Sequence, residues 1–178
     1  MRRLPTILLC IAALLVSCIK EKQTGADLAV GDRIPEFSVK LNDGSMVHSS
    51  SLNEGVSCIM FFTTACPDCQ NTLPQMQMLY DEYAAKGVRF LLVSREDGDS
   101  AVASYWASNG LTMPYSAQND RSVYELFAKT RVPRVYINKD GLIQAIFTDI
   151  PANPTYEQMK AVIENLSYSF CVAEEWCL

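Results

Sequence analysis

The tetrapeptide Cys66-Pro67-Asp68-Cys69 limits what this chain can fold into more than any other feature of its sequence. It follows the apolar run 56–63, which is typical of a buried strand, and it precedes 70–86, where apolar residues recur with a helical period. A dithiol is therefore expected at a helix N-terminus, where unpaired N–H groups and the helix dipole stabilise a thiolate. The pattern predicts a redox site in which Cys66 attacks a disulfide and Cys69 resolves the mixed disulfide.

Two other roles of the dithiol fit the sequence less well. A closed zinc site needs four ligands, yet the chain has one histidine, His48, and its remaining cysteine pair, Cys171 and Cys177, lies far along the sequence. A structural disulfide within so short a segment would remove little conformational entropy from the unfolded chain. We therefore predict that the two thiols themselves carry the chemistry, with neither a metal nor a cofactor.

The N-terminal residues 1–17 are typical of an export signal rather than of a folded element. A basic start precedes the apolar stretch 4–16, which is too short to span a bilayer. The segment ends in Leu15-Val16-Ser17-Cys18, which resembles a bacterial lipobox. The resemblance implies that Cys18 is lipidated, and several acyl chains suffice for stable membrane attachment. An ordinary secretory signal with an incidental cysteine is the alternative.

The remaining chain divides into a polar tether and one domain. We expect the lipidated cysteine and the tether over 18–29, and a single domain with one sizeable core over 30–178. The formal net charge is −5 at pH 7 without a basic cluster, which argues against a nucleic-acid partner. These features predict a protein of the bacterial cell envelope, lipid-anchored to a membrane, with its domain in the periplasm or exposed at the surface.

The cysteines outside the tetrapeptide have simpler interpretations. Of the seven cysteines, Cys10 leaves with the signal, and Cys58 falls within the apolar run, where a small buried side chain is expected. Disulfides persist outside the cytoplasm. For Cys171 and Cys177 we favour a local structural bridge over two free thiols or a second redox pair.

The order of expected elements predicts an α/β fold, in which a central mixed sheet is flanked by helices, with an N-terminal β-hairpin and an inserted helical segment. The turns Asn42-Asp43-Gly44 and Lys139-Asp140-Gly141 mark two hairpins, and His48 ends the first of them as a surface residue. The expected strands are 36–41, 45–48, 57–63, 88–94, 134–138 and 142–147, and the expected helices are 67–86, 100–109, 121–129 and 155–169.

Val132-Pro133 stands directly before a predicted strand. A proline cannot donate a hydrogen bond to a sheet, so the simple interpretation is a strand start. The alternative is a cis peptide bond whose exposed edge faces the dithiol and accepts the backbone of a substrate. The sequence alone leaves both open, because few X–Pro bonds in folded proteins are cis.

Three motifs together resemble the thioredoxin superfamily, in its membrane-anchored TlpA/ResA-type branch of AhpC/TSA-Redoxin-like thiol-disulfide oxidoreductases. The resemblance covers 30–166 and implies a thioredoxin-like fold. The motifs are Phe61-Phe62-Thr63-Thr64-Ala65 before the dithiol, Leu73-Pro74 after it, and Arg131-Val132-Pro133-Arg134-Val135-Tyr136-Ile137 before the second hairpin turn.

The resemblance also implies roles for particular residues. Cys66 would be the exposed nucleophile, Cys69 the resolving thiol and Pro133 a cis-proline. Protein disulfides would be the substrates, and a membrane reductase of the DsbD or CcdA kind would restore the dithiol. The substrate-binding surface would comprise Pro133, Val132, Pro67 and Asp68.

The chain departs from the family pattern around the dithiol. Relatives often have tryptophan immediately before the first cysteine, where this chain has Ala65. Many keep a buried acid that shuttles protons to the resolving cysteine, at the positions of Met60 or Thr72, and neither of these side chains titrates usefully. We therefore expect proton transfer through Glu96 or Asp97, just past the strand predicted over 88–94, or through water.

The residues between the cysteines predict the direction of electron flow. The carboxylate of Asp68 disfavours a thiolate on Cys66, which makes the disulfide harder to reduce and the protein a better reductant.

Two functions other than disulfide reduction are alternatives. One is a peroxiredoxin-like peroxidase, for which Thr63 fits the T-x-x-C motif but Ile59 replaces its proline. The other is a redox-silent binding lipoprotein. The client stays open between an apocytochrome c, a wrongly oxidised envelope protein and a partner oxidoreductase.

Overall fold

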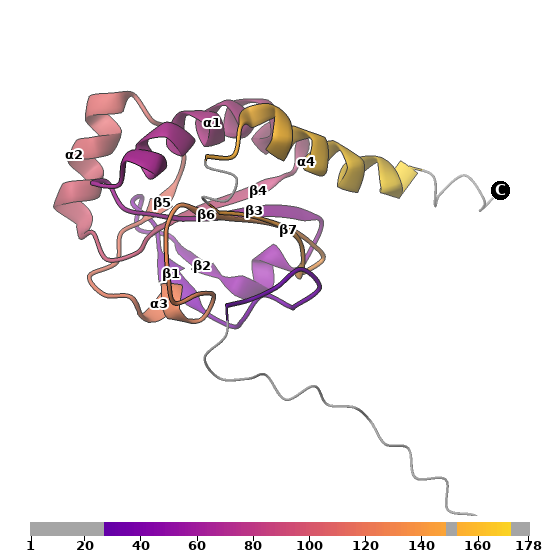
Figure 1. Ribbon diagram of the computed structural model, residues 1–178, viewed down its shortest axis with the longest axis horizontal. Coiled ribbons are helices and arrows are strands. Elements are labelled where there is room, and N and C mark those ends of the chain that lie inside the picture. The colour runs from indigo at the N-terminus through magenta and orange to yellow at the C-terminus, as the bar shows by residue number, and fades with distance from the viewer. Residues whose placement is uncertain (1–26, 149–152, 172–178) are drawn as a thin grey trace, which may run out of the picture.

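A mixed five-stranded sheet forms the centre of the computed structural model, which describes residues 27–148 and 153–171 (Figure 1). Its strand order is β5-β4-β3-β6-β7; β3 and β5 run parallel to β4, and β6 runs antiparallel to both β3 and β7. The export signal, Cys18 and Cys177 lie outside the described residues. The strands are β3 (Val56–Phe62), β4 (Arg89–Ser94), β5 (Tyr115–Ser116), β6 (Arg134–Lys139) and β7 (Leu142–Phe147).

The central strand β3 is buried along its whole length. Because successive strand residues point to opposite faces, Met60 and Phe62 enter the core on one side of the sheet, and Ile59 and Phe61 enter the core on the other. The near-continuous apolar run thus reflects a sheet that is covered on both faces.

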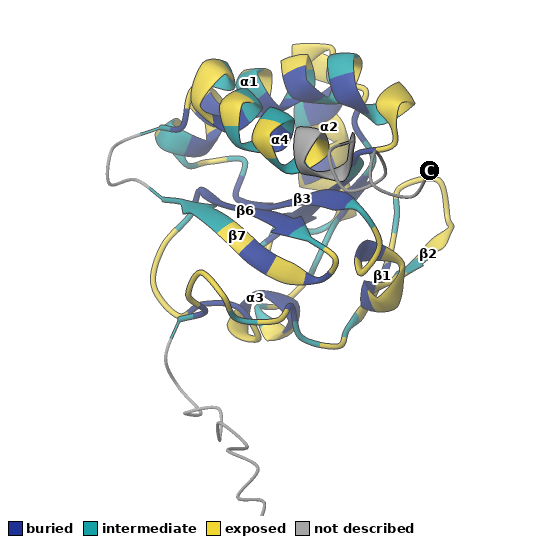
Figure 2. Cartoon of the chain, turned by 90° about the vertical axis from the view of Figure 1, so that its right-hand side faces the viewer, coloured by how far each residue is buried: buried dark blue, intermediate teal, exposed yellow. Residues whose placement is uncertain are grey.

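Each face of the sheet has its own cover (Figures 1 and 2). The long helices α1 (Pro67–Tyr83), α2 (Asp99–Asn109) and α4 (Tyr156–Cys171) lie on one face. The opposite face is covered by the hairpin of β1 (Ser38–Lys40) and β2 (Met46–His48), the short helix α3 (Ser122–Glu125) and the chain before β1. Two 3₁₀ turns, η1 (Ser49–Leu52) and η2 (Ala84–Lys86), complete the elements.

Both predicted hairpins are confirmed, and their turns have the backbone that their residues favour. Gly44 adopts φ 87° between β1 and β2, and Asp140 and Gly141 adopt φ 51° and 74° between β6 and β7. A Cβ atom on Gly141 would also collide with the side chain of Asn53. Glycine is therefore required at Gly141 both by its backbone angle and by this close approach. His48 is exposed, as predicted, and its Nδ1 lies 2.7 Å from the Ser38 hydroxyl.

The inserted segment differs from expectation in two places. The helix predicted over 121–129 ends at Glu125. After it the chain tightens, because the N–H groups of Leu126 and Phe127 donate to carbonyls three residues earlier. The Phe127 carbonyl then accepts hydrogen bonds from the Leu28 N–H and the Tyr136 hydroxyl. The short edge strand β5 was not predicted. It lies in the segment left between two expected helices, and its formation depends on pairing with β4.

The packed region begins before residue 30. Leu28 is buried, and its N–H donates to the Phe127 carbonyl at 2.8 Å. Asp27 accepts a hydrogen bond from the Lys129 N–H at 2.8 Å. The end of the segment interpreted as a tether therefore lies against the domain. Within the part of the chain that the structure describes, no helix is both long and apolar enough to cross a membrane.

Candidate active site

The dithiol lies where β3 leads into α1. Cys66 is the N-cap of α1, in an extended conformation, and its carbonyl accepts the first helical hydrogen bond from the Gln70 N–H at 3.0 Å. Pro67 occupies the first turn, where its missing N–H costs no hydrogen bond. Asp68 follows it, and an acidic side chain in this turn complements the helix dipole. The local sequence thus accounts for a helix that starts at the first cysteine.

The two thiols have different environments. Cys66 is half-buried and Cys69 is fully buried, and both are free thiols. Burial raises the pKa of the Cys69 thiol far above its usual range, and hydrogen bonding with Cys66 and the charge of Asp68 add to this effect. A backbone hydrogen bond with Thr63 acts in the opposite direction. Cys66 is therefore the more accessible thiol, while Cys69 needs a proton acceptor before it can attack.

A second loop meets the dithiol from the neighbouring strand. In the antiparallel register of β3 and β6, Phe61 lies opposite Arg134, so the chain that enters β6 passes beside the chain that leaves β3. The peptide bond Val132–Pro133 in this loop is cis, as the family resemblance implied. The Cys66 thiol donates a hydrogen bond to the Val132 carbonyl, with 3.6 Å between sulfur and oxygen. The tertiary structure thus places these two sequence-distant segments in contact.

The surface around Cys66 is only partly covered. Ala65 and Pro67 are exposed, Asp68 and Val132 are half-buried, and Pro133 is buried. The alanine in place of the family's tryptophan leaves a small side chain on the exposed side of the dithiol. An extended polypeptide could approach Cys66 over this surface without displacing a bulky side chain.

The two acids expected to transfer protons occupy different positions. The Asp97 carboxylate accepts a hydrogen bond from the Thr64 N–H at 2.5 Å, on the loop that carries Cys66. Glu96 is exposed and pairs with Arg95 and Arg121 instead. The structure therefore brings Asp97, but not Glu96, into contact with the loop before the dithiol.

The positions that hold a buried acid in many relatives are apolar or hydrogen-bonded here. Met60 and Thr72 are both fully buried. The Thr72 hydroxyl donates to the Asp68 carbonyl at 2.8 Å within α1. The sequence-based conclusion that neither residue can exchange a proton with Cys69 agrees with these surroundings.

Sequence reasoning missed one ion pair next to the cis-proline loop. Arg134, the residue after Pro133, is buried, and its Nη2 lies 2.7 Å from the Asp27 carboxylate. The signal in the sequence was a charged residue at the start of an otherwise apolar strand. Its partner, 107 positions earlier in the chain, has no local signature.

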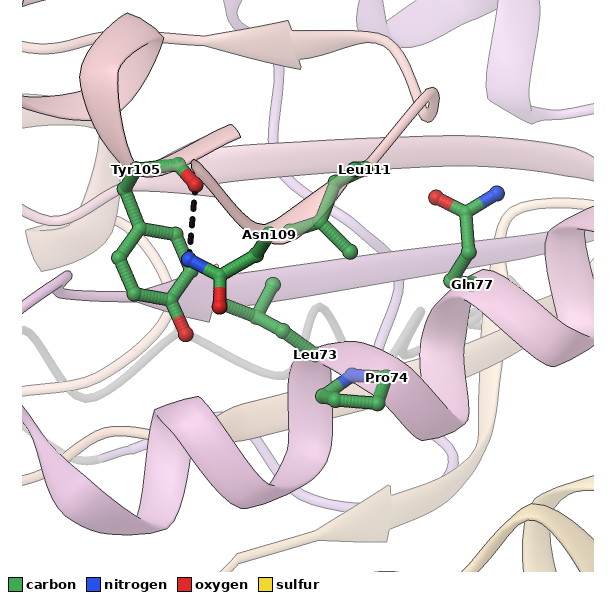
Figure 3. Close-up of a pocket in the computed structure, with 7 residues that line it drawn as sticks. Leu73, Pro74, Gln77, Tyr105, Asn109 and Leu111 are labelled. Carbon is green, nitrogen blue, oxygen red and sulfur yellow. Dashed lines mark hydrogen bonds between the residues drawn. The ribbon is translucent and has the colours of Figure 1, made fainter. Parts of the chain in front are cut away.

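A small pocket of about 180 Å³ lies between α1 and the C-terminal end of α2 (Figure 3). Asn109 donates to the Tyr105 carbonyl at 2.8 Å on one wall. Burial, and to a lesser degree the nearby Cys69, raise the pKa of Tyr105 above its usual value. Neither cysteine lines the pocket. Among the described residues, no group of three or more His, Cys, Asp and Glu side chains could hold a metal ion. The pocket is lined by Leu73, Pro74, Gln77, Tyr105, Asn109, Gly110 and Leu111.

Comparisons with known proteins agree with this geometry. Residues 30–146 match the model of the AhpC/TSA family. The thiol-disulfide oxidoreductase ResA of Oceanobacillus iheyensis is 30% identical over 146 residues, which cover 79% of this chain and 76% of that protein. The ResA of Bacillus thuringiensis (strain Al Hakam) is 23% identical over 141 residues, which cover 79% of this chain and 80% of that protein.

Solved structures show the same fold at lower identity. A thiol:disulfide interchange protein of the thioredoxin family from Chlorobium tepidum superposes with a TM-score of 0.66 at 19% identity, covering 78% of this chain and 98% of that one. A secreted disulfide oxidoreductase from Mycobacterium tuberculosis superposes with a TM-score of 0.65 at 15% identity, covering 73% and 96%.

The named relatives decide between the functional classes that the sequence left open. They are thiol-disulfide oxidoreductases, so they favour neither a thiol peroxidase nor a redox-silent binding lipoprotein. The family match extends over most of the folded domain and includes both cysteines of the dithiol. The chain therefore belongs to the AhpC/TSA family and is a thiol-disulfide oxidoreductase of the ResA type with a thioredoxin-like fold.

Proposed function

We propose that this protein reduces disulfides in protein substrates, with Cys66 as the nucleophile and Cys69 as the resolving thiol. One observation carries the proposal: at the start of α1 a half-buried thiol precedes a fully buried one, and the accessible thiol contacts the Val132 carbonyl. This asymmetry supports a first attack by Cys66, because an incoming disulfide can reach it, and an intramolecular second step by Cys69.

The reaction consists of two thiol-disulfide exchanges. The Cys66 thiolate attacks one sulfur of the client disulfide and forms a mixed disulfide with it, while the client S–S bond breaks and the other client sulfur leaves as a thiolate. Cys69 loses its proton and attacks the Cys66 sulfur, which releases the second client thiolate. Two electrons and two protons pass to the client, and the protein is left with a Cys66–Cys69 disulfide.

The loop at the cis-proline supplies the substrate surface in this proposal. An extended client segment would lie alongside Val132 and Pro133 and pair with exposed backbone, as in other cases of strand addition. Pro67 and Asp68 form the other border of this surface, on the first turn of α1. The contact of Cys66 with the Val132 carbonyl supports the assignment, since a client held there has its sulfur next to the nucleophile.

Asp97 is the proton acceptor that the geometry supports best for Cys69, directly or through water. Its carboxylate contacts the loop that carries the dithiol, through the Thr64 N–H. Glu96 is the weaker candidate, because Arg95 and Arg121 already pair with its carboxylate.

The charge of Asp68 supports a reductase rather than an oxidase. A carboxylate beside the thiols opposes the thiolate form, and a less stabilised reduced state gives up its electrons more readily. Sustained reduction requires a source of electrons, and we propose a membrane reductase of the DsbD or CcdA kind that reduces the Cys66–Cys69 disulfide.

We place this activity in the bacterial cell envelope. The export signal over 1–17 and the lipobox ending at Cys18 support a lipid anchor, followed by a short tether and the redox domain. One structural neighbour is described as a secreted disulfide oxidoreductase, which is consistent with this location.

The deciding experiment is the reduction potential of the Cys66–Cys69 couple, measured in a lipid-free form that starts after Cys18, against glutathione or dithiothreitol buffers. A value near or below roughly −220 mV supports the reductase, and a value near about −120 mV reverses the direction of electron flow. Reduction of a protein disulfide by this form, lost on Cys66→Ser, tests the activity itself. Peroxide consumption without disulfide reduction would instead identify a peroxidase.

A further inference from the structure

The carboxylate of Asp27 holds the loop that precedes the cis-proline. One oxygen accepts a hydrogen bond from the Lys129 N–H at 2.8 Å, and the other accepts one from the Thr130 hydroxyl at 3.4 Å. Asp27 lies near the end of the segment 18–29 interpreted as a tether. The start of the folded domain is therefore bonded to a loop more than 100 positions later in the chain.

The same carboxylate pairs with a buried arginine on the far side of the loop. Arg134 Nη2 lies 2.7 Å from the Asp27 carboxylate and also donates to the Thr130 hydroxyl at 3.2 Å. The Arg134 side chain is 7% exposed and that of Asp27 is 30% exposed, so water screens this ion pair only in part. Asp27 and Arg134 thus fix both ends of the short segment 129–134.

This segment contains the residues that face the nucleophile. Val132 and Pro133 lie between the two ends that the ion pair holds, and the Val132 carbonyl accepts the hydrogen bond from the Cys66 thiol. The loop is also held at Arg131, whose carbonyl accepts a hydrogen bond from the Tyr124 hydroxyl at 2.9 Å. The position of the Val132 carbonyl relative to Cys66 therefore depends on contacts that lie outside the dithiol.

We propose that the Asp27–Arg134 ion pair is a positioning pair, which holds the Val132–Pro133 loop in place for client binding and sets its contact with the Cys66 thiol. The part that concerns clients rests on the proposed function. The part that concerns the thiol does not, because the hydrogen bond to Val132 stabilises the protonated form of Cys66 whatever the client is.

The test compares Asp27→Asn with the wild type in the full chain. Asparagine keeps an oxygen for the Lys129 N–H but removes the charge that faces Arg134. We expect the KM for reduction of insulin to rise about fivefold, a typical size for a coupled contact, with kcat changed less than about twofold. In a Cys69→Ser background, we expect the pH midpoint of Cys66 alkylation by iodoacetamide to fall by about half a unit, because the bond that favours the thiol is weakened.

Asp32→Asn is the matched control. Asp32 lies in the same N-terminal segment and accepts a hydrogen bond from the Ala29 N–H at 2.9 Å, a contact that involves no residue of 129–134. This variant should keep the wild-type KM and the wild-type alkylation midpoint. If circular dichroism shows that Asp27→Asn is folded, and if its KM and alkylation midpoint match those of the control, the positioning role is refuted.

A second variant covers the case in which Asp27→Asn does not fold. Arg134→Lys keeps the charge, but its side chain is one bond shorter and does not extend to the position of Nη2, the single nitrogen that contacts both Asp27 and Thr130. The same shifts in KM and alkylation midpoint are expected. Failure of the proposed function has a different signature: the wild type would not reduce insulin, while the alkylation midpoints would still decide whether the ion pair positions the loop.

Discussion

The sulfur of Cys66 lies 3.6 Å from the carbonyl oxygen of Val132 and donates a hydrogen bond to it. The contact joins the N-cap of α1 to the loop before β6, and the antiparallel pairing of β3 with β6 brings these segments together. A client polypeptide that binds along the loop would meet the accessible thiol there. The predictions below test the roles of the groups that surround this contact.

Replacing each cysteine of the dithiol by serine should block a different step of the reaction. Cys66→Ser removes the accessible nucleophile, so we expect disulfide reduction to fall to the uncatalysed rate. Cys69→Ser leaves the first exchange intact but removes the resolving thiol, so a mixed disulfide between Cys66 and the client should accumulate. Non-reducing electrophoresis and intact mass measure both species. Accumulation of the adduct in Cys66→Ser would reverse the assigned roles.

Asp68→His should raise the reduction potential of the dithiol by some tens of millivolts, because removing the carboxylate and adding a partial positive charge stabilise the thiolate, and about 30 mV corresponds to 1.4 kcal/mol. Asp68→Asn removes the negative charge without adding a positive one, so its reduction potential should lie between those of the wild type and Asp68→His. Equilibration against glutathione measures the potential. An unchanged or lower value in Asp68→His would contradict the argument for a reductase.

Asp97→Asn should slow the second exchange by about tenfold or more, since loss of a positioned proton acceptor typically costs at least this factor. The amide oxygen can still accept the Thr64 N–H, so the loop should keep its place. Glu96→Gln is the matched control, because its carboxylate faces Arg95 and Arg121. Rapid-quench decay of the Cys66 mixed disulfide gives the rate. Equal rates in the two variants would exclude a role for Asp97.

The buried thiol of Cys58 should make the reduced protein less stable at high pH. Burial raises the pKa of Cys58 from 9.0 to about 12, so between these two pH values the unfolded thiol ionises while the folded one does not. This contribution to stability is complete below pH 9 and is lost as the pH rises, at about 1.4 kcal/mol per pH unit.

Cys58→Ala isolates this effect. The variant should lose stability between pH 9 and 10.5 less steeply than the wild type, by about 1.4 kcal/mol per pH unit, while Cys69 contributes the same slope to both. Urea unfolding at several pH values, with both proteins fully reduced, gives the two slopes. Parallel slopes would show that the Cys58 thiol ionises in the folded protein.

Local sequence signals were sufficient for most elements of the fold. The apolar run before Cys66, the helical period after Cys69 and the Asp-Gly turns at Gly44 and Gly141 correspond to β3, α1 and the two hairpins. Each of these signals acts within a few residues, through side-chain periodicity, helix capping or the backbone freedom of glycine.

Elements that depend on distant partners were not predictable in this way. The strand β5 exists through two register pairs with β4, and the segment after the short helix α3 is held by hydrogen bonds of the Phe127 carbonyl with Leu28 and Tyr136. Both segments thus adopt conformations that depend on contacts with partners outside them.

The sequence by itself determined the chemistry of this protein: a dithiol at a helix N-terminus, within an α/β domain of recognisable order. Only the tertiary structure decided the isomer of the Val132–Pro133 bond and the pairing of Asp27 with Arg134. It also decided that Asp97, and not Glu96, contacts the loop that carries the dithiol. The physical reason is that most of the helices and strands of this domain, β5 excepted, are governed by neighbours in sequence. The contacts of a site depend instead on which strands pair and in which register, and those are properties of the whole fold.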